Sequence, residues 1–176
     1  MSENNNTNQT PKIKLGLFTY SCCEDNTIMI TVLMNDYLIE WKKRIDFVEG
    51  RVLRKKKSNN GLDVAFVEGA IVAKEQEEKI KKLRERTKIL VAIGSCACTG
   101  MPAGIRNNFN EEANKEIEFI KNRFQYTDKV KRVEDVVKVD AKVPGCPMNT
   151  KLFLKTLNKV FVDFGHEPVE LLEEHK

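Results

Sequence analysis

The sequence predicts an α/β fold with a mostly parallel sheet and helices on both faces. Short strand-like segments alternate with longer segments of helical periodicity, which is the pattern of βαβ units. Some of the strand-like segments are apolar throughout, as expected for parallel strands that are buried on both faces. In addition, cysteine-containing turns follow three of the strand-like segments, which places them at one edge of such a sheet.

The expected strands are short apolar or alternating runs, bounded by turn-forming residues. They cover residues 13–18, 45–53, 63–69, 88–94 and 136–139. The run at 88–94 is the clearest, because five apolar residues precede its terminal glycine. The run at 63–69 also ends in glycine, as a buried parallel strand often does.

The expected helices cover residues 27–43, 70–86, 111–124 and 148–164. Asp25, Asn26 or Thr27 is suited to cap the first helix, and Asn110 to cap the third. Pro147 suits the first turn of the last helix, and Gly165 is expected to end it. The apolar positions of the first helix are Ile28, Thr31, Val32, Tyr37, Leu38 and Trp41.

Length and composition describe one soluble globular domain. The 176 residues are 41% hydrophobic and 32% charged. We expect a disordered tail at 1–11, the folded domain at 12–166 and a loose acidic tail at 167–176. No apolar run approaches the roughly 20 residues that span a bilayer, and the N-terminus lacks the apolar core of a signal peptide. A cytoplasmic protein without a membrane span is therefore expected.

The charge pattern argues against nucleic-acid binding. The net charge is only +4, and the densest basic run lies at residues 54–57. No aromatic residues interleave with that run, as they do in single-strand binding surfaces. It is interpreted as a solvated loop.

The cysteines form three patches, each following an expected strand. They are Cys22 with Cys23, Cys96 with Cys98, and Cys146 in a Pro-Gly-Cys-Pro turn. Five cysteines, an odd number without an export signal, argue against a disulfide framework. Thiolates that converge at one sheet edge indicate a metal centre, chiefly zinc or an iron–sulfur cluster.

Several alternatives to a metal centre remain open at this point. No Cys-x-x-Cys pair is present, and buried free cysteines are also ordinary small apolar residues. Packing is the favoured interpretation for Cys98. Thiol catalysis is disfavoured because His166 and His175, the two histidines, lie far along the chain from every patch.

Four segments, taken in order, resemble a known family. They are Ser21-Cys22-Cys23-Glu24, Asp63 through Ala70, Val91 through Ala97, and Val143-Pro144-Gly145-Cys146-Pro147. Together they are similar to the small-subunit family shared by nickel–iron hydrogenases and the 20 kDa cluster-bearing subunit of respiratory complex I. The resemblance extends over about residues 13–160.

The resemblance implies a flavodoxin-like domain that binds one four-iron, four-sulfur (4Fe-4S) cluster. By position, Cys22, Cys23, Cys96 and Cys146 are the implied ligands. The adjacent pair Cys22-Cys23 departs from the Cys-x-x-Cys pattern of hydrogenases and matches the complex I subunit. Asp25 or Cys98 therefore remains an alternative for the fourth ligand.

Further residues are expected to surround the cluster, namely Glu68, Ser21 and Asp25. Glu68 either tunes the cluster or serves a proton path, or its carboxylate accepts bonds from amides of the following turn. The loop at 99–107 resembles a loop of cytoplasmic hydrogenases. Met101 and Ile105 are expected to exclude water there, and Arg106 either pairs across a subunit contact or is solvent-exposed.

The resemblance implies an electron-transfer small subunit of a cytosolic NiFe hydrogenase or a similar oxidoreductase complex. The expected partners are a large catalytic subunit and a further electron-transfer subunit, and no activity is expected alone. Only one cluster is expected, because no spare cysteine set remains. The alternatives are a complex I-type subunit of a nickel-free enzyme, a zinc–thiolate scaffold, and a flavin or nucleotide module. The last is disfavoured because the first turn lacks Gly-x-Gly-x-x-Gly.

Overall fold

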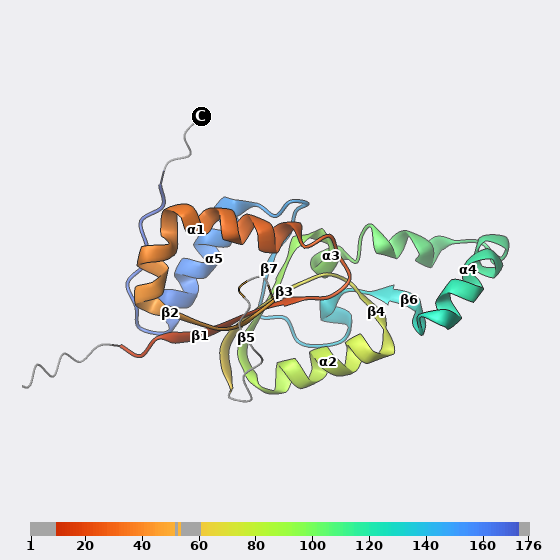
Figure 1. Ribbon diagram of the computed structural model, residues 1–176, viewed down its shortest axis with the longest axis horizontal. Coiled ribbons are helices and arrows are strands. Elements are labelled where there is room, and N and C mark those ends of the chain that lie inside the picture. Colours follow the sequence, from red (N-terminus) through yellow and green to blue (C-terminus); the bar gives the residue numbers. More distant parts are fainter. Residues whose placement is uncertain (1–9, 52, 54–60, 173–176) are drawn as a thin grey trace, which may run out of the picture.

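The computed structural model describes residues 10–51, 53 and 61–172. Within these residues the main feature is a five-stranded parallel sheet, seen nearly edge-on in Figure 1. Its strand order is β2 (Ile45–Gly50), β1 (Ile13–Thr19), β3 (Leu62–Glu68), β5 (Thr87–Ile93) and β7 (Ala141–Val143). β2 lies on one side of β1 and β3 lies on the other, so the order in which strands are added to the sheet switches between β1 and β3. Folds of this kind bind ligands at such a switch point.

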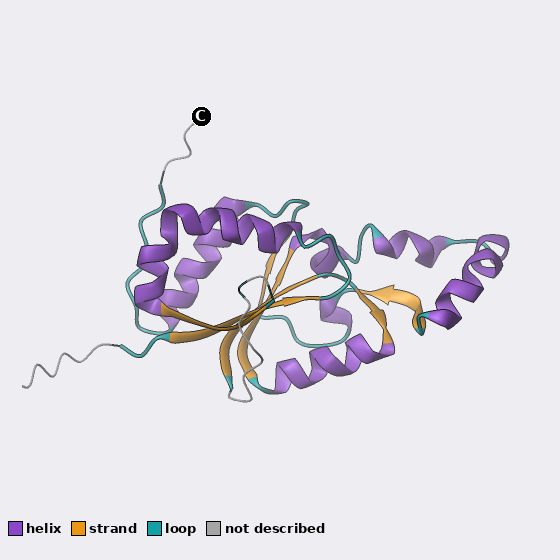
Figure 2. Cartoon of the chain, viewed as in Figure 1, coloured by secondary structure: helices purple, strands orange, loops and turns teal. Residues whose placement is uncertain are grey.

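Helices cover both faces of this sheet, as Figures 1 and 2 show. α1 (Asp25–Arg44) and α5 (Thr150–Asp163) lie on one face, and α2 (Lys74–Glu85) lies on the other. A short helix, α3 (Gly94–Thr99), follows β5 directly. The predicted α/β class with a parallel sheet and two helical layers is confirmed.

Successive side chains of the central strands point to opposite faces of the sheet, so the core consists of two layers. In β3, Val64 and Phe66 face the α1–α5 layer, while Ala65 and Val67 face α2. All four side chains are at most 1% exposed. This burial on both faces explains why the central strands are apolar throughout in the sequence.

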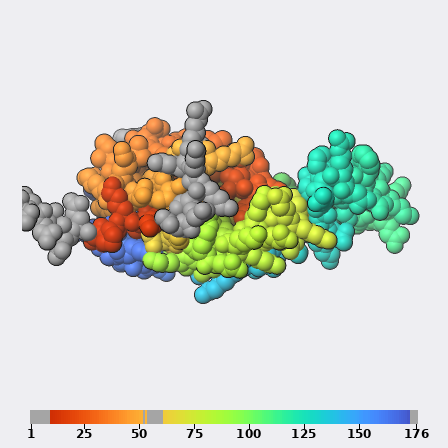
Figure 3. Space-filling model, turned by 60° about the horizontal axis from the view of Figure 1, so that its bottom comes forward, coloured from red at the N-terminus to blue at the C-terminus, as the bar shows by residue number. Residues whose placement is uncertain are grey.

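A smaller lobe extends from one end of the sheet. It contains β4 (Ile71–Ala73), which pairs antiparallel with β6 (Tyr126–Lys131), and the helix α4 (Glu111–Arg123). Two 3₁₀ helices, Ala103–Asn108 and Val133–Asp135, connect these elements to the body. No residue of α4 is buried, and Figure 3 shows its part of the chain standing apart from the rest of the molecule.

Several sequence-based assignments were wrong. The strand expected at 45–53 ends at Gly50, and the second cysteine patch, expected as a turn, lies in the helix α3. Residues 136–139 form no strand; the last strand of the sheet is β7, which pairs with β5. The segment 71–73 is a strand, and α2 begins only at Lys74. β6 was not predicted, because only Thr127 and Val130 of its six residues are buried and its sequence is mostly polar.

The helix ends agree in part with the sequence. Asn110 caps α4 by accepting a bond from the N–H group of Ala113, and Gly165 follows α5 in a left-handed conformation, so both predictions are confirmed. Pro147 does not begin the last helix, because it lies in a turn, and Asn149 caps α5 instead.

The predicted capping of α1 was wrong as well. No side chain caps this helix, and Asn26 and Thr27 point inward instead. Of the apolar positions expected to bury α1, Tyr37 and Trp41 are buried, together with Ile30. Ile28, Val32 and Leu38 are exposed on its outer face.

The chain remains packed beyond residue 166. Val169 is buried against the core, and Asn158 bonds both its N–H and its carbonyl group. The N–H group of Leu172 donates to the hydroxyl of Tyr37. The described part of the segment expected as a loose tail is therefore held by α1 and α5.

The basic run at 54–57 lies outside the described residues, as do residues 1–9 of the expected N-terminal tail. Within the described ranges, none of the helices combines the length and apolar character needed to cross a bilayer.

Candidate metal centre

The three cysteine-bearing segments lie at the carboxyl edge of the sheet. Cys22 and Cys23 follow β1, Cys96 lies in the first turn after β5, and Cys146 follows β7. The turn after β3, at Gly69, is part of the same edge. Parallel strands place these loops next to one another although they are up to 124 positions apart in the sequence.

Backbone hydrogen bonds join these loops directly. Ser21 and Ala70 exchange two of them, at 3.2 and 3.0 Å, which ties the first patch to the loop after β3. The N–H group of Ser95 donates to the carbonyl of Gly145 at 2.8 Å, which ties the second patch to the third. The positions of the cysteines relative to one another are thus set by the main chain.

Two of the thiols share an apolar environment. Cys96 is 8% exposed and packs with Ala70, Val72 and Val130, and the half-buried Cys22 lies against the same cluster. The thiols of Cys23 and Cys146 are exposed. The site therefore has an apolar floor and opens toward the surface.

Burial and neighbouring charges raise the pKa of two of the thiols. Burial is the main cause that raises the pKa of the Cys22 thiol to about 12, and the charges of Glu68, Cys96 and Cys23 raise it further. Burial also raises the pKa of the Cys96 thiol, with added effects from Cys23 and Cys146. Metal binding at this edge has to displace protons from these thiols, so it is coupled to pH.

Cys98 does not join this group. Its thiol donates to the carbonyl of Ala92 at 3.4 Å, and it packs in the core layer between the sheet and α2. Burial raises the pKa of the Cys98 thiol and the charge of Glu134 raises it further, whereas a backbone hydrogen bond at Val143 and the charge of Lys142 lower it. Its packing role, the favoured interpretation from the sequence, agrees with this placement.

Glu68 forms the buried polar centre of the edge. It is 1% exposed and accepts hydrogen bonds from the side chains of Thr19 at 3.3 Å, Asn26 at 3.2 Å and Thr27. The alternative that its carboxylate accepts from amides of the next turn was wrong, because the N–H group of Ala70 donates to Ser21 instead. Its charge adds to the rise in the pKa of the Cys22 thiol.

Ser21 and Asp25 flank the first patch. The Ser21 hydroxyl exchanges hydrogen bonds with the side-chain amide of Gln76 at 3.0 and 3.4 Å, which anchors the patch to α2. Asp25 is the first residue of α1 and is half-buried. It lies close enough to Cys23 in sequence to remain an alternative ligand.

The loop after the second patch forms part of the rim. Met101 is 43% and Ile105 53% exposed, so both present apolar surface to solvent. Arg106 is half-buried: it lies over the ring of Tyr126 and donates to the carbonyl of Asp128. Plain solvent exposure, one of the two interpretations of Arg106, was therefore wrong.

The donor set fits an iron–sulfur cluster. Four thiols lie along one edge of the sheet, above an apolar floor. The main chain of this edge packs tightly at Gly69 and Gly145, both of positive φ, as suits loops whose amides donate to the sulfurs of a cluster. In the part of the chain that the structure describes, no three His, Cys, Asp or Glu side chains are grouped tightly enough to share one metal ion. The ligands of a four-iron cluster bind different iron atoms, so they stand farther apart than ligands of a single ion.

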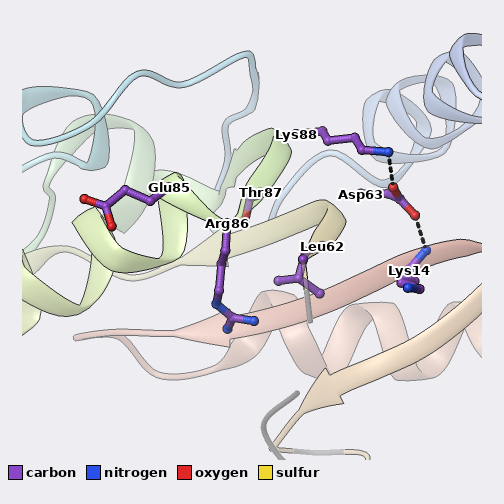
Figure 4. Close-up of a pocket in the computed structure, with 8 residues that line it drawn as sticks. Lys14, Leu62, Asp63, Glu85, Arg86, Thr87 and Lys88 are labelled. Carbon is purple, nitrogen blue, oxygen red and sulfur yellow. Dashed lines mark hydrogen bonds and ion pairs between the residues drawn. The ribbon is translucent and has the colours of Figure 1, made fainter. Parts of the chain in front are cut away.

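Two hollows in the described part of the chain lie away from the cysteines. One of about 490 Å³ is at the opposite, amino edge of the sheet, lined by charged residues including Lys14, Asp63 and Lys88 (Figure 4). Another, of about 320 Å³, lies between α2 and the end of β1. Neither includes a cysteine, so cavity size does not locate the site.

Sequence reasoning missed Asn26 and Thr27 as site residues. Both are 6% exposed, which is unusual for polar residues. The available signal was their position: they directly follow the first cysteine patch at a strand end where ligands bind. The capping preference of these residue types led to the wrong interpretation.

Fold and site together define a parallel α/β domain with a cysteine-rich carboxyl edge. Residues 22–160 match the model of the family described as NADH ubiquinone oxidoreductase, 20 Kd subunit, and this chain belongs to that family. The matched range includes every cysteine of the site, and it agrees with the resemblance inferred from the four motifs.

Several relatives that the chain matches are named as hydrogenase subunits. The delta subunit of sulfhydrogenase 2 from Pyrococcus furiosus is 29% identical over 157 residues, which are 89% of this chain and 65% of the relative. A subunit of the vhu F420-non-reducing hydrogenase from Methanocaldococcus jannaschii is 28% identical over 174 residues, 90% of this chain and 59% of the relative. This chain therefore spans about three fifths of the length of these two relatives.

Solved structures show the same fold. The subunit matched in the crystal structure of an NAD⁺-reducing NiFe hydrogenase in the H₂-reduced state has a TM-score of 0.72 at 20% identity, covering 92% of this chain and 96% of that one. The Ni-Fe-Se hydrogenase of Desulfomicrobium baculatum gives a TM-score of 0.60 at 18% identity, covering 93% and 68%.

Proposed function

We propose that this chain is the electron-transfer small subunit of a hydrogenase or hydrogenase-like complex. It binds one 4Fe-4S cluster through Cys22, Cys23, Cys96 and Cys146. The observation that carries the proposal is the convergence of these thiols, from three distant segments, on the sheet edge of a chain that belongs to this family. The names of its relatives support the hydrogenase setting.

The bound cluster would supply one-electron transfer; the protein's part is to hold and shield it. Cys22 and Cys96 approach from the apolar floor, which lowers the local dielectric constant. Cys23 and Cys146 close the exposed side, where a partner protein would exclude water. Glu68 places a hydrogen-bonded carboxylate beneath the thiols, where its charge acts on the cluster potential.

We also propose that a large catalytic subunit docks at this end of the molecule. Met101 and Ile105 extend the cysteine edge with exposed apolar surface, and more follows on the lobe that Figure 1 shows beside α3. The exposed apolar residues of the lobe are Phe109, Phe119, Ile120, Phe124 and Tyr126. Aromatic side chains of this kind are enriched in the cores of protein interfaces.

A nickel-free partner of the complex I type is the second candidate. It is favoured by one specific observation, the adjacent pair Cys22-Cys23, together with the description of the matching family. Both candidates assign the same cluster and the same ligands to this chain. Co-purification of the large subunit, followed by nickel analysis of the complex, distinguishes them.

The test of the proposed cluster compares two cysteines of the same patch. We expect the anaerobically purified chain to be brown and to contain about four iron and four acid-labile sulfide per chain. Cys96→Ala removes a ligand and should abolish both, whereas Cys98→Ala should retain both and change stability by no more than about 2 kcal/mol.

Zinc analysis of the same samples tests the scaffold alternative. One zinc per chain without sulfide would replace the cluster proposal with a zinc–thiolate site. Equal iron loss in Cys96→Ala and Cys98→Ala would contradict the ligand assignment, because only the first thiol lies with the other cysteines. Circular dichroism of both variants confirms that they fold.

A further inference from the structure

Asn26 contacts every segment that builds the cysteine edge. It lies in the first turn of α1, three residues after Cys23, and is only 6% exposed. Its side-chain Nδ2 donates to Glu68 Oε2 at 3.2 Å, at the end of β3. Its Oδ1 accepts from the N–H group of Met148 at 2.9 Å, two residues after Cys146.

The same side chain also lies against the second patch. Gly94, two residues before Cys96, has a φ of +78°, and a methyl group there would overlap the Asn26 amide. Glycine at this position thus lets the Asn26 side chain pass close to the start of α3. One amide side chain therefore touches the loops that carry all three patches, as well as the carboxylate beneath them.

The Asn26 side chain pairs a backbone group that is buried. Met148 is 3% exposed, and the Asn26 oxygen is the acceptor for its N–H group. Leaving a buried N–H group unpaired is costly, so the Pro-Gly-Cys-Pro turn would shift to find another partner. Cys146 lies inside that turn and would move with it.

We propose that Asn26 is a positioning residue that holds the three cysteine-bearing loops at the spacing one cluster requires. The inference rests on the proposed function and extends it to a residue that is not itself a ligand. Groups that orient metal ligands through hydrogen bonds commonly contribute tenfold or more to metal affinity. Asn26 differs from such groups only in acting on several ligands at once, through the backbone of their loops.

The test uses two substitutions with different consequences. Asn26→Ala removes both hydrogen bonds. Asn26→Asp keeps the shape and an oxygen for Met148, but it replaces the donor to Glu68 with a second carboxylate oxygen. The second variant keeps the size of the side chain, so it carries the test where Asn26→Ala fails to fold.

The matched control is Asn158→Ala. Asn158 also bonds one backbone N–H group and one backbone carbonyl, both of Val169, at 2.9 and 2.8 Å, but it does so beside the C-terminal segment. Its removal costs the protein a comparable pair of hydrogen bonds without touching the cysteine edge. A change seen in Asn26 variants and not in Asn158→Ala is therefore local to the site.

The first measurement is made on the cluster-loaded full chain. Iron release to a chelator is followed under anaerobic conditions by the loss of visible absorbance. We expect both Asn26 variants to release iron about tenfold faster than the wild type, with an altered EPR spectrum of the reduced cluster, and Asn158→Ala to match the wild type. Wild-type release rates in both Asn26 variants, or equal acceleration in Asn158→Ala, would overturn the inference.

The second measurement uses the metal-free chain and does not depend on the cluster. Iodoacetamide labelling of Cys96 is compared with that of Cys98, which lies in the other core layer and serves as the internal reference. In Asn26→Asp, iodoacetamide should label Cys96 several-fold faster than in the wild type, and Cys98 at the wild-type rate. Equal rates of Cys96 labelling in wild type and variant would overturn the positioning role. If the wild type binds neither iron nor sulfide, the proposed function fails while this measurement still decides the role of Asn26.

Discussion

The two edges of the sheet differ in chemistry although the same strands form both. At the carboxyl edge the buried polar groups are thiols, hydroxyls, an amide and one carboxylate, Glu68, whose partners are all uncharged donors; the ion pair of Arg51 with Glu24 lies exposed beside them. At the amino edge the polar groups are charged: Lys88 pairs with Asp63 at 2.8 Å, and the Asp63 carboxylate also accepts from the N–H group of Lys14 at 2.8 Å. Figure 4 shows the Lys88–Asp63 pair bordering the hollow at this edge.

This difference shows that the chemistry of the side chains, rather than the volume of a hollow, identifies the candidate site in this fold. The amino edge has the larger hollow but only solvent-screened charges, since the Lys88 side chain is 69% exposed. The loops of the carboxyl edge are instead cross-linked by hydrogen bonds, including the buried bond from the Met148 N–H group to Asn26. Binding chemistry is therefore expected at the carboxyl edge alone.

The largest expected effect comes from the fourth ligand. Cys23→Ser should lose nearly all cluster iron and sulfide, because a four-iron cluster takes four thiolates. Asp25→Asn should keep both, since the carboxylate is not needed if Cys23 binds. Metal and sulfide analysis of anaerobically purified protein measures the outcome.

A control at the other edge sharpens the comparison. Lys88→Ala, beside the hollow of Figure 4, should leave iron and sulfide at wild-type levels. Loss of the cluster in Asp25→Asn with retention in Cys23→Ser would reverse the assignment and make Asp25 the ligand. Loss in Lys88→Ala would break the distinction between the edges.

Much of this contrast was predictable from the sequence. The fold class followed from alternating strand and helix patterns, and the central strands were recognisable because burial on both faces makes them apolar. The carboxyl-edge location of the cysteines then followed from the topology of parallel sheets. The cap Asn110 was equally readable, because it is decided by local geometry.

What the sequence did not reveal depends on contacts between distant segments. β6 is a mostly polar strand that exists because it pairs with β4, and no periodicity marks it. Asn26 and Thr27 have the composition of a helix cap, but the buried carboxylate of Glu68, 41 residues from Thr27, draws them inward. Tertiary partners thus outweighed local preference at the functional edge.

An intermediate effect is expected from the buried carboxylate. Glu68→Gln removes a negative charge near the cluster. Because this removal favours the reduced cluster, the reduction potential should rise by tens of millivolts. For one electron, roughly 40 mV corresponds to about 1 kcal/mol. Spectroelectrochemical titration measures the shift. Glu49→Gln, whose carboxylate pairs with Arg86, is the control and should leave the potential unchanged. A lowered potential in Glu68→Gln would contradict the placement of this charge beside the thiols.

The smallest effect concerns the amino edge and depends on pH. Burial alone would raise the pKa of Asp63, but hydrogen bonds from the Lys88 side chain and the Lys14 N–H group, with their charges, lower it below its ordinary value. A carboxyl whose pKa is lower in the folded state stabilises the protein above its unfolded-state pKa of about 3.9, and this contribution disappears as the pH falls through the folded-state value.

Asp63→Asn should therefore reduce the free energy of unfolding by only about 0.5 kcal/mol at neutral pH, because solvent screens the pair. The difference should shrink as the pH falls below about 3.9 and vanish once the wild-type carboxyl is protonated in the folded state as well. Urea unfolding at neutral and acidic pH measures this, with Asp36→Asn on the exposed side of α1 as control. A difference that grows on acidification contradicts the sign of the shift. A loss of cluster iron in Asp63→Asn at neutral pH would show that the two edges are coupled, and the sheet could then no longer be divided into a binding edge and a structural one.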